Sequence, residues 1–172
     1  MKQYNNDLTP EILASLDKPT FSDDQVAGMS QEWQELITKQ QTELKQHPVI
    51  DIYRIAVEGS LIRDGGILKT ATATSEVEIS TGQKLRVAQT RDTVVYPDGT
   101  EATIISGAGE AAHNNAGRSV ALVGSRLSNG DEITSTPQGT GILVLRRGIP
   151  AAKGFLVDNF EVDKMLAAET AH

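Results

Sequence analysis

Arg54-Ile-Ala-Val-Glu-Gly-Ser60 is the first of three related stretches, and the other two are Arg86-Val-Ala-Gln-Thr-Arg-Asp92 and Ser119-Val-Ala-Leu-Val-Gly-Ser125. Each stretch has a hydrophobic residue followed by an alanine. Two variable residues come next, then Gly or a polar replacement, and finally Ser or Asp. The alanines lie 32 and 33 residues apart, which is a period typical of repeat architectures. The repeated positions are Ala56 and Gly59, Ala88 and Asp92, and Ala121 and Gly124.

A turn follows each stretch, and a β-like run follows each turn. The turns are Arg63-Asp-Gly-Gly66, Tyr96-Pro-Asp-Gly99 and Ser128-Asn-Gly-Asp131. Gly, Asn, Asp and Pro are the residues that tight turns prefer. The sequence therefore predicts a strand, turn and strand unit that occurs about three times, in a mainly β protein.

Composition divides the chain into three predicted parts. Residues 1–50, 51–149 and 150–172 carry net charges of −4, −1 and −2, which sum to the −7 of the whole chain. Of the 15 glycines, 13 lie in 51–149. A nearly neutral, glycine-rich middle between acidic flanks predicts a β-domain with a helical N-terminal extension and a C-terminal extension that ends in a short helix capped at Asn159.

The clearest predicted helix covers residues 30–46, and Pro48 ends it. Trp33, Leu36 and Ile37 fall on one face at helical spacing. Two interpretations stay open for this apolar face. It packs on the chain's own β-domain, or it docks on a partner protein.

Several functions have little support in the composition. A net charge of −7 argues against nucleic acid as a partner, and the absence of cysteine excludes disulfides and thiolate metal sites. The three histidines are scattered, so a zinc hydrolase or a catalytic triad is not expected. The acidic pairs Asp23-Asp24 and Asp131-Glu132 are predicted to be solvated surface rather than an acid and a base. We expect no catalytic residues and no cofactor.

Residues 54–145 resemble the PAAR-repeat proteins, which cap the spike of contractile injection machines such as phage tails and type VI secretion systems. The family pattern is a run similar to RpVArvGD, a glycine turn about four residues later, and a strand pair. Arg54-Ile-Ala-Val-Glu-Gly-Ser-Leu-Ile-Arg-Asp-Gly-Gly66 follows this pattern, and the other two repeats follow it in order. The resemblance covers a little over half of the chain.

The family usually holds zinc with histidines and a cysteine from the turns. The matching positions here are Asp64, Tyr96, Asp98 and Asn129, and none of them is His or Cys. Because zinc prefers nitrogen and sulfur ligands, we expect no metal and a tip closed by packing and hydrogen bonds in the turns. A hard cation held by oxygen atoms is the alternative.

The resemblance implies a cone of three repeats, with one copy on each trimeric spike, that meets the target-cell membrane transiently and is not a homo-oligomer. It implies a virion tail tip made in the host cytoplasm, or a bacterial tip that is secreted with its spike. The lack of a long C-terminal toxin favours a phage. An adaptor that loads an effector through residues 1–50 and a small β-fold binding module are the alternatives. The basic doublet Arg146-Arg147 is predicted to meet the partner or the chain's own acidic flank.

Overall fold

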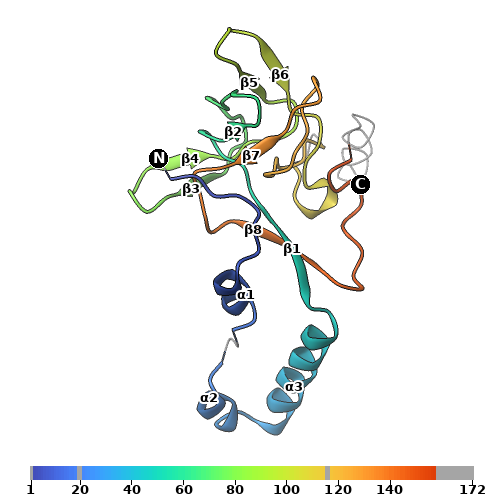
Figure 1. Cartoon of the computed structure of the whole chain (residues 1–172). Helices are drawn as coiled ribbons and strands as arrows, with labels where there is room; N and C mark the ends of the chain where they lie inside the picture. The colour runs from blue at the N-terminus through green and yellow to red at the C-terminus, as the bar shows by residue number, and fades with distance from the viewer. Residues whose placement is uncertain (1, 19–20, 115–116, 158–172) are drawn as a thin grey trace. The chain divides into compact units, whose positions relative to one another are not determined.

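The computed structural model describes residues 2–18, 21–114 and 117–157 of the chain (Figure 1). Short antiparallel strand pairs dominate and helices are few, which confirms the mainly β class. The strands pair as β1 with β8, β2 with β7, β3 with β4, and β5 with β6. The elements are α1 (Pro10–Leu16), α2 (Asp23–Ala27), α3 (Gln31–Gln46), β1 (Val49–Arg54), β2 (Leu61–Ile62), β3 (Glu76–Glu78), β4 (Lys84–Arg86), β5 (Thr93–Val95), β6 (Glu101–Thr103), the 3-10 turn η1 (Gly109–Ala111), β7 (Ile133–Ser135) and β8 (Ile142–Arg146).

The chain forms two compact units, which we call the repeat unit and the helical unit. The repeat unit contains residues 53–143 with the segments 2–6 and 151–157, and the helical unit contains 7–52 with 144–150. This division differs from the predicted ranges, because the first residues of the chain belong with the repeats and the end of β8 belongs with the helices. The predicted helix at Asn159 lies outside the described residues.

The three repeats are joined by a closed ring of backbone hydrogen bonds. The amide of Ala88 donates to the carbonyl of Ala56, that of Ala121 to Ala88, and that of Ala56 to Ala121, each at 2.9 Å. All three alanines are completely buried. Their neighbours also pair in rotation, as Val57 with Val87, Gln89 with Val120, and Leu122 with Ile55. The repeats therefore surround an internal threefold axis.

Each repeat then reverses direction through a residue with positive φ. These residues are Gly59 (91°), Arg91 (75°) and Gly124 (103°). Their amides donate to the return strands, at Leu68, Ile104 and Ile133 respectively, over 2.7–2.8 Å. Positive φ is easy for glycine and unfavourable for other L-residues, which explains the two glycines and makes Arg91 the exception.

The hairpin of each repeat pairs with the next one, and we call these junctions seams. The first seam joins repeats one and two through Ile67 and Val95, and the second joins repeats two and three through Ile104 and Leu127. The third seam is the pairing of β2 with β7, which closes the ring. The core beneath them is aliphatic and includes Leu68, Val94, Ile104, Leu127 and Ile133.

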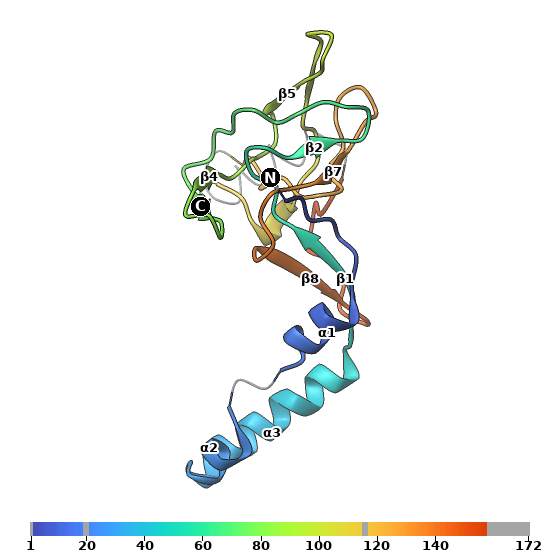
Figure 2. The same ribbon diagram turned by 60° about the vertical axis from the view of Figure 1, so that its left-hand side comes forward.

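The second hairpin is longer than the other two. Its ends, Asp92 and Ile104, pair 12 residues apart, whereas the ends of the first hairpin, Ser60 and Leu68, pair 8 residues apart. The third hairpin, between Ser125 and Ile133, has the shorter length as well. Accordingly, the β5–β6 hairpin extends beyond the turns of its neighbours in both views of the repeat unit (Figure 2).

The helical unit begins each helix with a polar cap. The Ser30 hydroxyl accepts from the amide of Trp33 at the start of α3, and Ser22 forms a capping box with Gln25 at the start of α2. The predicted helix over 30–46 is thus confirmed as α3. No residue of α3 is buried, and Trp33 and Leu36 are 60% and 44% exposed while Ile37 is half-buried. Within the helical unit this face is therefore open, and both interpretations, packing on the chain's own β-domain and docking on a partner, stay predictions.

The end of α3 is tied to residues 146–147. The guanidinium of Arg146 donates to the carbonyl of His47 at 3.0 Å, and the Nδ1 atom of His47 donates to the carbonyl of Arg147 at 2.9 Å. A cation at a helix C-terminus is favourable because unpaired carbonyls gather there. Within the helical unit, Arg146 therefore contacts a backbone carbonyl of residues 1–50, the acidic N-terminal flank, and a contact of the doublet with a partner stays a prediction.

We expect Ala88→Leu to destabilise the repeat unit by about 1–3 kcal/mol, because the ring of buried alanines leaves no room for a larger side chain. Chemical denaturation would measure the change. Ala14→Leu, at an exposed position of α1, is the matched control and should leave stability nearly unchanged. An equal effect of the two substitutions would contradict close packing at the axis.

Candidate functional site

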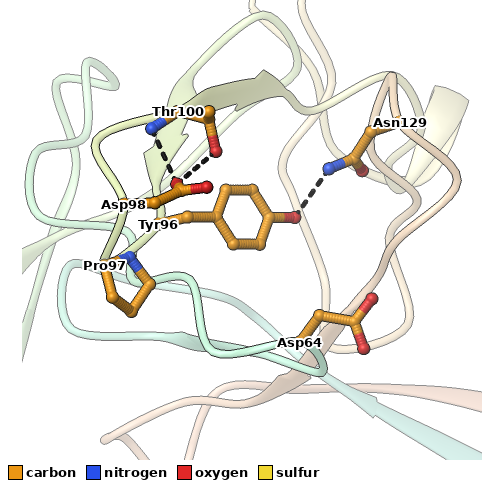
Figure 3. A pocket seen from close by; sticks show the side chains of 6 residues that line it. All are labelled: Asp64, Tyr96, Pro97, Asp98, Thr100 and Asn129. Carbon is orange, nitrogen blue, oxygen red and sulfur yellow. Dashed lines mark hydrogen bonds between the residues drawn. The ribbon is translucent and has the colours of Figure 1, made fainter.

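The turns of the three repeats meet at one end of the repeat unit. Asp64 comes from the first turn, Tyr96, Pro97, Asp98 and Thr100 from the second, and Asn129 from the third. Together they line an open pocket of about 330 Å³ (Figure 3). The structure thus brings together all four residues that were predicted at the positions of the family's metal ligands.

Local turn chemistry places these side chains. Gly65, Gly99 and Gly130 occupy equivalent positions with φ of 100°, 87° and 85°. In the second turn the Asp98 carboxylate accepts from the amide of Thr100 at 3.0 Å and from its hydroxyl at 2.6 Å. These bonds hold the pKa of Asp98 below its usual value, although its side chain is exposed. Asp98 therefore stabilises its own turn.

The hydroxyl of Tyr96 connects two other turn residues. It donates to Asp131 Oδ2 at 2.8 Å and accepts from Asn129 Nδ2 at 2.9 Å. The ring of Tyr96 crosses from the second turn toward the third, as Figure 3 shows for Asn129. Burial raises the pKa of Tyr96, the bond from Asn129 opposes that rise, and the Asp131 carboxylate adds to it. The hydroxyl stays protonated and keeps its donor role well above neutral pH.

Asp131 is the centre of this network and is only 2% exposed. Burial works against its ionised form, but donors from Tyr96, from the amides of Glu132 and Asp64, and the charge of Arg63 outweigh burial and lower its pKa. The Nε atom of Arg63 lies 3.4 Å from Asp131 Oδ1. The prediction that Asp131 is solvated surface is therefore wrong, because donors from all three turns surround its carboxylate.

Hydrogen bonds among Tyr96, Asn129, Asp131 and the amide of Asp64 link the three turns, and we call this network the clasp. No group of three or more His, Asp or Glu side chains that could hold a metal ion occurs among the described residues. The oxygen atoms of Asp131 already accept from protein donors, and Asp98 is engaged in its own turn. A phenol, a carboxylate and an amide in this arrangement orient the turns and offer no activated nucleophile.

The remaining predicted residues lie in the frame of the repeats. Ala56, Ala88 and Ala121 form the axial ring, and Gly59 and Gly124 form the reversing turns. The carboxylate of Asp92 is buried and accepts from Thr72, from the amide of Gln89 and from Arg118.

Sequence reasoning missed Asp131 and Arg63. Asp131 follows the turn glycine at the position where the first repeat has Gly66, and because turns accept both Asp and Gly, this position did not indicate a buried carboxylate.

No family model matches this chain, and no curated protein or solved structure matches it either. Among the described residues, no helix has the length and apolar character that crossing a membrane requires.

We expect Tyr96→Phe to destabilise the repeat unit by about 1–3 kcal/mol, because it removes a donor from a buried carboxylate. Thermal or chemical unfolding would measure the loss. Tyr4→Phe, in the same unit, is a control that changes one hydroxyl outside the clasp. A loss no larger than that of the control would contradict the role of Tyr96.

The contribution of Tyr96 to the free energy of unfolding should decrease at both low and high pH. The pKa of Asp131 is lowered from 3.8 by folding, so its stabilisation exists above that value and disappears as pH falls through the folded pKa. The pKa of Tyr96 is raised from 10.0, so its stabilisation exists below that value and disappears as pH rises through the folded pKa. The difference in unfolding free energy between wild type and Tyr96→Phe should be largest at about pH 5–9 and smaller outside that range. A difference independent of pH would contradict the assignment.

Proposed function

We propose that this protein is a non-enzymatic tip that caps the trimeric central spike of a contractile phage tail, with one copy per trimer. The closed ring of Ala56, Ala88 and Ala121 carries the proposal. A homotrimer ends in three equivalent surfaces, and a single chain can meet all three only if it presents three similar surfaces around one axis. The internal threefold arrangement supplies this match.

The clasp of the turns supports the same role. A tip that transmits force needs turns that do not separate, and Tyr96 joins the second and third turns while Asp131 reaches the first through the amide of Asp64. In this proposal the clasp end points toward the target-cell membrane, and it takes the place of the zinc site that the family resemblance implies. The work is mechanical and requires no catalytic residue.

The helical unit favours a second candidate function, which is an adaptor on a secretion-system tip. Trp33 and Leu36 expose large apolar surface on α3, and such surface in a small protein is often a docking site. The adaptor would bind a cargo protein through α3 while the repeat unit caps the spike. The chain would then be found in the bacterial cytoplasm and would leave with the spike.

Native mass spectrometry tests the capping proposal. The tagged chain, purified from its own source, should be found with three copies of one larger subunit per copy of this chain. A lone monomer, or a homo-oligomer without a larger partner, would overturn the proposal.

A precise excision separates the two candidate functions. Deleting residues 1–50 is unsuitable because it removes Gln3 and Asn6, which bond to the repeat unit. Residues 7–52 can instead be replaced by a linker of about four Gly and Ser residues, since the side chain of Asn6 already accepts from the amide of Arg54 at 2.9 Å.

We expect the excised protein to keep the 3:1 complex with the spike. The adaptor function predicts that it loses a second partner that the full chain retains, whereas a simple tip loses none. Loss of the spike complex itself would place spike binding in the helical unit and contradict the role of the repeats. Circular dichroism and thermal unfolding of the excised protein would establish that the repeat unit is intact.

A further inference from the structure

The three seams of the repeat unit are covered differently. After each hairpin the chain leaves through an exit segment, and the segments at equivalent distances from Leu68, Ile104 and Ile133 are 70–72, 106–108 and 135–137. At the third seam an N-terminal segment lies on the exit: Tyr4 and Thr136 exchange two backbone hydrogen bonds of 2.8 and 3.0 Å. Gln3 also donates to the carbonyl of Gly59 at 3.2 Å, next to that repeat's reversing turn.

A C-terminal segment lies on the second exit. The amide of Leu156 donates to the carbonyl of Gly107 at 2.7 Å, and the amide of Glu110 donates to the carbonyl of Lys153 at 2.9 Å. The approach is close, because a Cβ atom on Gly109 would lie 2.5 Å from the carbonyl carbon of Gly154. Extended backbone from an end of the chain therefore binds two of the three equivalent exits.

The first exit has an open pocket instead. Thr70 and Thr72 are exposed and line a pocket of about 370 Å³ together with Arg91, Asp92, Thr93 and Arg118. Two arginines and one aspartate give this pocket a formal charge of +1 (2 − 1), in a chain whose net charge is −7. Arg118 already donates to Asp92 and to the carbonyl of Thr90, so the net positive charge of the pocket is that of Arg91. The hydroxyl of Thr72 is likewise bonded to Asp92 and Gln89.

Arg91 gives a second and independent indication. It adopts a φ of 75° at the position where the other two repeats have Gly59 and Gly124. An arginine in this conformation is strained, and strain of this kind gathers at sites where a side chain is needed for function. Its side chain is exposed beside the open pocket.

We propose that the first seam binds an extended, acidic segment of a partner protein. Amides of that segment would donate to carbonyls of exit 70–72, where the amides of Ala71 and Thr72 already donate to the carboxylates of Glu58 and Asp92, and its own carboxylates would contact Arg91. The equivalent seams hold peptide, which favours a peptide over a free anion. This inference rests on the symmetry of the repeat unit and not on the spike-tip proposal.

Two synthetic peptides of seven residues test the proposal, with Asp or Lys at three alternating positions of an otherwise identical Thr- and Val-based sequence. Each is titrated into the full-length, isotope-labelled protein while amide NMR signals are followed. We expect the Asp peptide to shift the signals of Thr70, Thr72 and Thr93 and to bind roughly tenfold more tightly than the Lys peptide. No binding of the Asp peptide up to about 5 mM would overturn the proposal.

Inorganic phosphate serves as a separate probe of the same pocket. If phosphate causes the same shifts at lower concentration than the Asp peptide, the pocket is a site for a small anion and the peptide proposal is wrong. If the peptide acts at the lower concentration, backbone contacts contribute and the proposal is supported.

Two variants at one position separate binding from folding. Arg91→Gly should weaken binding of the Asp peptide roughly fivefold or more, while the melting temperature stays the same or rises, because glycine relieves the positive φ. Arg91→Glu should abolish binding. Arg126→Glu makes the same charge change at another exposed arginine of the repeat unit and should leave binding unchanged. Unchanged affinity in Arg91→Gly would overturn the role of Arg91.

Discussion

The ring of hydrogen bonds among Ala56, Ala88 and Ala121 is the constraint on which the repeat unit depends. Each alanine donates to the one before it, so the three chain crossings close on themselves without a free edge. Closure of this kind is how β-structures avoid exposed strand edges. The small side chains follow from the geometry, because all three are fully buried at the axis. The reversing turns and the three seams are then positioned in rotation around that axis.

The clasp links the turns of three short hairpins and so compensates for the low stability of each hairpin alone. A hairpin of a few residues is marginally stable alone, and three of them need a link at the end farthest from the axial ring. Here the link is a buried carboxylate, Asp131, surrounded by donors from each turn. The hydroxyl of Tyr96 provides the contact between the second and third turns, and the longer second hairpin places it there.

Departures from symmetry show where the repeats have separate roles. The second repeat has the longer hairpin and has Arg91 where the others have glycine. The two ends of the chain lie on the second and third exits, whereas the first exit retains a pocket. The ring fixes the same alanine crossing in all three repeats, and beyond it the repeats differ both in hairpin length and in side chains. The helical unit is inserted in the chain between Asn6 and Tyr53, and within that unit Trp33 and Leu36 of α3 are exposed.

The sequence by itself determined the repeat period, the turn positions, the mainly β class and helix α3 with its Ser30 cap, because each depends on residues close together in the chain. The resemblance to the PAAR-repeat pattern grouped Asp64, Tyr96, Asp98 and Asn129, as the positions of that family's metal ligands. Only the tertiary structure decided that Asp131 is buried and that residues 2–6 belong with the repeats. These depend on contacts between residues as far apart as Tyr4 and Thr136, and no local pattern specifies which distant backbone will supply the partner for a hydrogen bond.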